Sequence, residues 1–319
     1  MDWFGAGIDG PLVVIRAIHF AATATIAGNL IFRAVVAEAG SGPASPAALI
    51  FRAQTLRVAW ICLAISVASG VIWILLEAAA MSGLSFAESM TSEVLSTVAN
   101  ATQFGRVTEA RFALAVMMAG FLAYDRVPLA RGLAVVMSLG LIAALAWTGH
   151  AGSTAGEMGI LHLAADTLHL IAAAIWIGGL VSLVLLLSVT RRDRTYAAVS
   201  FARDATQRFS TMGIAIVVVV LATGIVNAWI LLGSLHALIA TGYGRLLMLK
   251  IALFAVMLLF AAANRFWLTP RLAVPSGDEP QLEVLRRLAR NSMIEIALAL
   301  MIFAIVGVLG TLHPAIHAL

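Results

Sequence analysis

Residues 159–189 read GILHLAADTLHLIAAAIWIGGLVSLVLLLSV, and this stretch decides the class of fold. Asp166 is its only residue that is fully charged at neutral pH. A helix needs about 20 predominantly apolar residues to cross the hydrocarbon core of a bilayer, and a barrel strand needs far fewer. Because a helix satisfies its backbone hydrogen bonds internally, a run of this length predicts a transmembrane helix.

The composition of the whole chain agrees with this interpretation. Of the 319 residues, 62% are hydrophobic and 11% are charged, whereas soluble domains carry about 25% charged residues. The formal net charge is +4, but the basic residues lie between apolar runs and form no patch or arm. The expected partner is therefore the lipid bilayer and not nucleic acid. Cys62 is the only cysteine, which excludes a disulfide within the chain and a cysteine-based metal cluster.

Apolar runs of this kind recur along the chain and predict an all-α integral membrane protein. We expect eight transmembrane helices, at 11–37, 54–80, 106–124, 129–150, 159–189, 209–233, 243–266 and 289–312. The segment 81–104 is expected to be the longest outer connection, with room for a short surface helix. The segment 270–290 contains three prolines and is expected to be a soluble loop.

The basic residues predict the orientation of these helices. Most of the 20 lysines and arginines fall on alternate connections, whereas Glu88, Glu93 and Glu157 lie on the others. Since basic connections stay in the cytoplasm, both termini are expected to face the periplasmic side.

An internal repeat organises the predicted helices. His19 corresponds to His169, and Gly28 to Gly178, at the same offset. Matches in the following helices support the repeat: Gly70 with Gly224, Gly105 with Gly244, Arg111 with Lys250, Arg126 with Arg265, and His150 with His313. Residues 1–319 thus form a single membrane domain with repeats at about 1–152 and 153–319. Because four helices per repeat keep both halves in one orientation, we expect a pseudo-two-fold axis along the membrane normal.

The histidines are the candidate metal ligands. All seven fall on the outer half or the outer loops of the predicted topology. His162, Asp166 and His169 lie on one helical face, where a carboxylate can orient an imidazole ligand. The predicted copper ligands are His19, His150, His169 and His313, with His162 as an additional candidate. Asp166 and Arg16, which occupy equivalent repeat positions, are expected to support the ligands and to pair across the axis.

Other polar residues receive a structural interpretation. His236 and His317 are expected to be interfacial hydrogen-bonding residues, and changing them should be nearly silent. Lys250, Asn264, Asn227 and Glu295 lie within spans and are interpreted as groups that hold the helices together.

Several motifs are similar to those of the copper-resistance protein D family. They are Thr148-Gly149-His150-Ala151-Gly152, Asp166-Thr167-Leu168-His169, Ala174 to Leu180, Arg208-Phe209-Ser210, Tyr243-Gly244-Arg245 to Lys250, Asn264-Arg265-Phe266, Thr269-Pro270-Arg271-Leu272 and Leu309 to Leu312. The resemblance implies a bacterial inner-membrane protein that takes copper across or into the membrane. It also implies a periplasmic copper-binding partner, which would have to be a separate protein.

Two other functions are compatible with the same residues. Paired histidines in a four-helix unit also describe a haem b site with two axial imidazoles, and hence a membrane electron-transfer protein. A third possibility is a scaffold for a periplasmic copper chaperone that does not itself transport copper. The sequence contains no P-loop and predicts neither an ATP-driven pump nor an enzyme, unless a bound haem gives it a redox role.

Overall fold

The computed structural model describes residues 9–38, 45–273 and 278–317, and this part of the chain is helical with short connections. The helices are α1 (Gly10–Ile31), continued by a π-helical turn η1 (Phe32–Ala37), α2 (Pro46–Ser82), α3 (Ser92–Ala101), α4 (Gln103–Ala123), α5 (Pro128–Ala143) with the 3₁₀ turn η3 (Ala144–Thr148), α6 (His150–Ser153), α7 (Gly156–Asp193), α8 (Tyr196–Leu232), α9 (Ala237–Ala240), α10 (Gly242–Ala263), the π-helical turn η4 (Asn264–Leu268), α11 (Thr269–Ala273), α12 (Asp278–Leu309) and η5 (Ala315–His317).

Seven helical segments of the described chain are long and apolar enough to cross a membrane. They are Gly10–Ala37, Pro46–Ser82, Pro128–Thr148, Gly156–Asp193, Tyr196–Leu232, Gly242–Leu272 and Gln281–Leu309. The predicted span at 106–124 corresponds to α4, which contains Arg106, Glu109 and Arg111 and is not among the seven. Even so, α4 packs against α2 and α5, beside the long helices.

Two predictions about connections can be compared with the structure. The short surface helix expected within 81–104 is confirmed as α3. The soluble loop expected at 270–290 is wrong, because α11 and α12 occupy most of that segment. Pro280 stands in the first turn of α12, where proline is tolerated because its missing N–H would have had no helical partner. Pro270 lies in α11, directly after the π-helical turn η4.

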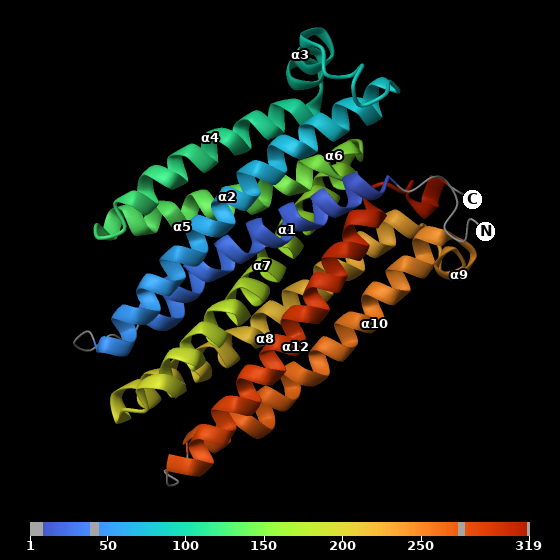
Figure 1. Cartoon of the computed structure of the whole chain (residues 1–319). Coiled ribbons are helices and arrows are strands. Elements are labelled where there is room, and N and C mark those ends of the chain that lie inside the picture. Colours follow the sequence, from blue (N-terminus) through green and yellow to red (C-terminus); the bar gives the residue numbers. More distant parts are fainter. Residues whose placement is uncertain (1–8, 39–44, 274–277, 318–319) are drawn as a thin grey trace.

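The helices form an elongated bundle with α1 and α7 adjacent at its centre (Figure 1). Helices α2 and α5 pack on α1, whereas α8 packs on α7, and α12 contacts both α1 and α7. The start of α1 lies at the same end of the bundle as α3, α6 and α9, which we call the terminal end (Figure 1). The opposite end holds the end of η1, the start of α2, and the α4–α5 and α7–α8 connections, and we call it the arginine end.

The two central helices cross at a pair of glycines. A Cβ on Gly178 would lie 2.7 Å from the Cα of Gly28, and a Cβ on Gly28 would lie 2.7 Å from the Cα of Gly178 and collide with the carbonyl oxygen of Ala174. One turn away, Ser182 donates a hydrogen bond of 2.9 Å to the amide oxygen of Asn29. Small residues permit this close approach, on which helix association in lipid depends.

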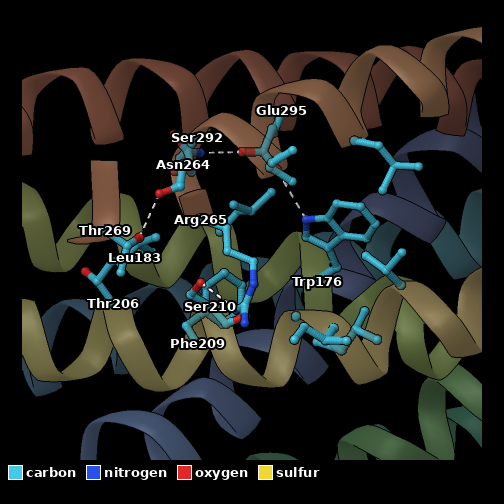
Figure 2. Close-up of a pocket in the computed structure, with 18 of the residues that line it drawn as sticks. Trp176, Leu183, Thr206, Phe209, Ser210, Asn264, Arg265, Thr269, Ser292 and Glu295 are labelled. Atoms are coloured by element: carbon cyan, nitrogen blue, oxygen red, sulfur yellow. Dashed lines mark hydrogen bonds between the residues drawn. The ribbon is translucent and has the colours of Figure 1, made fainter. Parts of the chain in front are cut away.

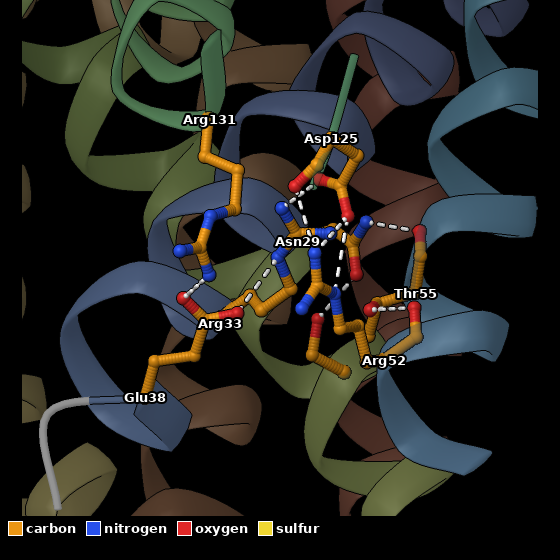
Figure 3. A network of polar contacts seen from close by, with 8 residues as sticks. Asn29, Arg33, Glu38, Arg52, Thr55, Asp125 and Arg131 are labelled. Carbon is orange, nitrogen blue, oxygen red and sulfur yellow. Dashed lines mark hydrogen bonds and ion pairs between the residues drawn. The ribbon is translucent and has the colours of Figure 1, made fainter. Parts of the chain in front are cut away.

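Charged side chains at the arginine end tie the first helices together (Figure 3). Arg33 of η1 forms an ion pair with Asp125 of the α4–α5 connection. The same carboxylate is 2.9 Å from Arg52 of α2. Arg131 of α5 pairs with Glu38 at 2.7 Å. Arg33 and Asp125 are buried, so these arginines join helices.

The glycine crossing predicts a specific effect of added volume. We expect Gly28→Ala to lower the free energy of unfolding by about 1–3 kcal/mol, because the backbones of α1 and α7 would have to separate. Gly120→Ala in α4 is the matched control, since a Cβ there meets nothing within 4 Å. Thermal unfolding in detergent measures both variants. Equal stability of Gly28→Ala and the unchanged protein would contradict the close approach.

The buried ion pair predicts a second loss of stability. Asp125→Asn leaves the buried charge of Arg33 with only the partly exposed carboxylate of Glu38, 3.5 Å from its Nε, and we expect a loss of about 3–5 kcal/mol. The control is Asp204→Asn, because the Arg203–Asp204 pair is much more exposed and such pairs contribute about 0–1 kcal/mol. Similar losses in the two variants would show that burial does not strengthen the Asp125 interaction.

Candidate functional site

In the first half of the chain, His19 lies in a closed polar cluster. Its Nδ1 is 2.8 Å from the hydroxyl of Ser69, which itself donates to the carbonyl oxygen of Ile65 at 2.6 Å. The Ser69 hydroxyl must therefore accept from Nδ1–H of His19, which leaves Nε2 with a lone pair. That Nε2 accepts a hydrogen bond from Arg111. Trp73 covers the ring at a centroid distance of 5.3 Å.

In the second half, His169 has a corresponding partner but more open surroundings. Its Nδ1 is 3.1 Å from the hydroxyl of Thr223, which donates to the carbonyl oxygen of Val219 at 2.6 Å. The same reasoning makes Nδ1 the donor and leaves Nε2 free to bind a ligand. Lys250 lines the same cavity as His169, but no hydrogen bond joins the two side chains among the described residues.

The two clusters use matching residue types on matching helices. Each histidine bonds a hydroxyl of the next long helix. The residue that follows this hydroxyl is a glycine, which packs on the imidazole ring. A Cβ added at Gly70 would lie 3.3 Å from the His19 ring, and a Cβ added at Gly224 would lie 3.4 Å from the His169 ring. The residue three positions further along is Trp73 in α2 and Asn227 in α8. An aromatic ring therefore closes the first cluster, whereas an amide leaves the second cluster polar.

The second cluster opens into a cavity of about 190 Å³ near the terminal end. His150, His162, Asp166 and His169 all line it, together with Arg16, Asn227, Tyr243 and Lys250. Five of the predicted site residues thus come together, from α1, α6 and α7.

The tautomer of His162 is fixed in the same way as that of His169. Its Nδ1 is 2.8 Å from the hydroxyl of Thr154, which donates to the backbone oxygen of His150 at 3.0 Å. Nε2 of His162 therefore keeps its lone pair. His150 donates from Nε2 to the backbone oxygen of Leu309 at 3.2 Å, which links α6 to the end of α12.

The remaining candidates lie elsewhere. His19 does not line this cavity, and His313 is exposed beyond the end of α12. His236 is exposed at the start of α9, as expected of an interfacial residue, and the side chain of His317 lies outside the described residues.

The predicted pairing of Arg16 with Asp166 is wrong for this structure. The guanidinium of Arg16 lies over the Trp73 ring at 5.1 Å, and Glu77 is close enough to stabilise its charge. Asp166 instead accepts a hydrogen bond of 3.0 Å from Asn227, with the charge of Lys250 nearby. Each charge therefore has partners in its own half, although both residues line the cavity.

The geometry limits which groups the site can hold. Within the described residues, no three His, Cys, Asp or Glu side chains are arranged as a complete metal site. A haem between two histidines needs two free axial nitrogens, but Nε2 of His19 is bonded to Arg111 and Nε2 of His150 to Leu309. These histidines do not fit a haem, whereas Nε2 of His162 and of His169 each keeps a lone pair.

Sequence reasoning missed several contributors to the cavity. Thr223 and Thr154 set the tautomers of two histidines, and Tyr243 packs against His150 at a ring-centroid distance of 6.2 Å. A threonine within a helical span has no sequence pattern that marks it as functional. Lys250 and Asn227 were interpreted as structural, although the match of Lys250 to Arg111 already placed a cation near each paired histidine.

These features define a multi-helix membrane protein whose enclosed cavity presents imidazoles and a carboxylate near one end. A family model described as Copper resistance protein D matches residues 203–309, and one described as Copper resistance protein D-like, N-terminal domain matches residues 7–160. The chain is 33% identical over 291 residues to Copper resistance protein D of Pseudomonas syringae pv. tomato, covering 88% of this chain and 89% of that protein. The chain belongs to the copper resistance protein D family.

Two further relatives match shorter parts of the chain. Copper transport protein CutJ of Bacillus subtilis is 38% identical over 133 residues, which are 41% of this chain and 23% of that protein. Inner membrane protein YebZ of Escherichia coli is 32% identical over 170 residues, which are 53% of this chain and 55% of that protein. No solved structure matches the chain.

Proposed function

We propose that the protein captures copper in the cavity at the terminal end and carries it across or into the bacterial inner membrane. The observation that carries the proposal is that hydrogen bonds fix the tautomers of His162 and His169. Each ring donates Nδ1–H to a threonine that donates onward to a backbone oxygen. Metal-binding histidines usually have their second nitrogen fixed in this way. The membership in a copper resistance family supports copper as the cargo.

In this proposal His162 and His169 are the principal ligands, and His150 lines the same cavity. Asp166 balances part of the cation's charge and fixes the local geometry with Asn227. Two imidazoles in a line suit Cu(I), and a square of nitrogen ligands suits Cu(II).

The other sequence candidates keep defined roles. His19 is the counterpart of His169, and it can bind copper once Arg111 withdraws from Nε2. His313, exposed at the terminal end, is a first contact for incoming copper. Arg16 supports the cavity wall through its stacking on Trp73. A separate periplasmic copper-binding protein is the proposed donor, and the role as a scaffold for such a protein is the alternative.

We further propose that α4 is an eighth span and that the halves are related by an axis along the membrane normal. The contact of Gly28 with Gly178, which are equivalent in the repeat, supports such an axis. The matching clusters around His19 and His169 support it as well. The terminal end then faces the periplasm, with both chain termini, and the arginine end faces the cytoplasm.

Removing the principal ligands tests the copper site. We expect His162→Ala and His169→Ala each to abolish stoichiometric copper binding, and Asp166→Asn to weaken it about 10–100-fold. His19→Ala should have a smaller effect, because Nε2 of His19 is bonded to Arg111. His236→Ala is the control and should bind normally. Isothermal titration with metal analysis of the purified protein gives the result, and normal binding by folded His169→Ala would refute the site.

The pH dependence follows from the ligand form. Copper binds neutral imidazole, so protons compete with the metal. For imidazoles with the ordinary pKa of about 6.5, affinity should be full above that pH and fall as the pH drops below it. An affinity that stayed constant down to pH about 5 would exclude imidazole ligands of ordinary pKa.

A visible spectrum of the same samples separates copper from haem, since a Soret band with split reduced peaks would favour the haem alternative.

Reporter fusions test the orientation. An enzyme that is active only in the periplasm should work when it is fused after Leu319 or near Glu93, because both positions are assigned to the outer side. It should be silent near Asp278, in the arginine-rich connection. The opposite pattern would reverse the assignment of the copper cavity to the periplasmic face.

A further inference from the structure

A second cavity lies deeper in the same half, towards the arginine end, and encloses a carboxylate (Figure 2). It has a volume of about 430 Å³ and lies between α7, α8, η4 and α12. Glu295 lines it and is 1% exposed. Trp176 donates from Nε1 to one oxygen of Glu295 at 3.3 Å, and Asn264 donates to the other oxygen at 2.8 Å.

Both of these donors are neutral, and Glu295 has no ion pair within the described residues. Arg265, the other charged side chain described around this cavity, donates instead to the backbone oxygen and hydroxyl of Ser210. An isolated carboxylate is costly to bury in a membrane. Glu295 therefore has to carry a proton or hold a cation.

The cavity also contains an unused hydroxyl. Ser292, one helical turn before Glu295, is fully buried, and its Oγ has no hydrogen-bond partner. Asn264 and Arg265 belong to η4, and such π-helical turns are frequent at functional sites. A water or a hydrated ion in this cavity would thus meet Ser292, Asn264 and Glu295.

Trp176 connects this inner cavity with the copper cavity. A third cavity, of about 240 Å³, shares Trp176 with the inner one and shares His169 and Lys250 with the outer one. The Trp176 ring packs against Phe254 at a centroid distance of 5.7 Å. Three adjoining cavities therefore run from His169 to Glu295, with the indole that bonds Glu295 at the inner junction.

We propose that Glu295 is a proton-binding site and that copper movement through the second half is coupled to it. The proposal rests on the proposed transport of copper. A singly charged cation such as Cu(I) that enters the inner cavity from the outer cavity displaces the proton from Glu295 towards the terminal end, so that the carboxylate charge stays balanced. When the cation leaves towards the arginine end, Glu295 takes up a proton from that end. Each cycle exchanges cations for protons. The hydrogen bond from Trp176 to the Glu295 carboxylate changes with the protonation of that carboxylate.

Infrared spectroscopy of the copper-free protein in lipid tests the proton directly. At neutral pH we expect a C=O band of a protonated carboxylic acid that shifts in D₂O and is lost in Glu295→Gln. Glu77→Gln is the matched control, because Glu77 also accepts from a tryptophan, Trp73, at 2.9 Å but lies near Arg16. Glu77→Gln should keep the band. An unchanged band in Glu295→Gln, or its loss in Glu77→Gln alone, would overturn the proposal.

Transport in proteoliposomes tests the coupling. Copper uptake by the unchanged protein should respond to a pH gradient and should move protons in the opposite direction. Glu295→Gln should bind copper in the outer cavity as tightly as the unchanged protein but lose the response to the gradient, and Glu295→Asp should restore it. A gradient response equal to that of the unchanged protein in Glu295→Gln would overturn the coupling.

The failures of the two proposals can be told apart. If the unchanged protein takes up no copper, the proposed transport fails, and the coupling that rests on it fails too, whereas the infrared result still decides whether Glu295 holds a proton. If the infrared band is absent from the unchanged protein, a bound cation occupies the site and the proton proposal is overturned, whatever the uptake.

Discussion

The close approach of α1 and α7 at Gly28 and Gly178 is the constraint on which the rest of the bundle depends. Lipid gives apolar helices no hydrophobic reason to associate, so backbone packing and buried polar bonds have to hold them. The glycines bring the two helices together, and the Ser182–Asn29 bond fixes them one turn away. Each central helix then presents its histidine to its own outer helices, which separates the clusters of His19 and His169.

The clusters show how one arrangement can serve either structure or binding. Arg111 and Trp73 satisfy and cover His19, so that its polar atoms are used in holding α1, α2 and α4 together. Around His169, Asn227 occupies the position of Trp73 and bonds to Asp166, not to the imidazole. The His169 ring then lines a cavity and no guanidinium bonds it among the described residues. If the halves are related as proposed, two exchanges distinguish the closed cluster from the open one: Trp73 for Asn227 and Arg111 for Lys250.

The sequence was sufficient for the helical class and for α3, because each depends on local periodicity. It was insufficient where neighbours decide. The prolines suggested a loop at 270–290, although Pro280 stands in the first turn of α12 and Pro270 lies in α11. Arg16 and Asp166 were expected to meet because their charges are opposite. Instead, Arg16 stacks on Trp73 and Asp166 accepts a hydrogen bond from Asn227, and both of these partners belong to other helices. No spacing rule indicates that Thr223 fixes the tautomer of His169.

The two tryptophan–carboxylate pairs extend this contrast between the halves. Trp73 donates to Glu77 four residues later in the same helix, and Arg16 lies over the same indole. Trp176 donates to Glu295 on a different helix, with Asn264 as the second donor. The first carboxylate has the cation of Arg16 close by. The second has only neutral donors, so its charge depends on what occupies the cavity. A group whose charge depends on occupancy can couple a passing cation to a proton, whereas one with a fixed partner cannot.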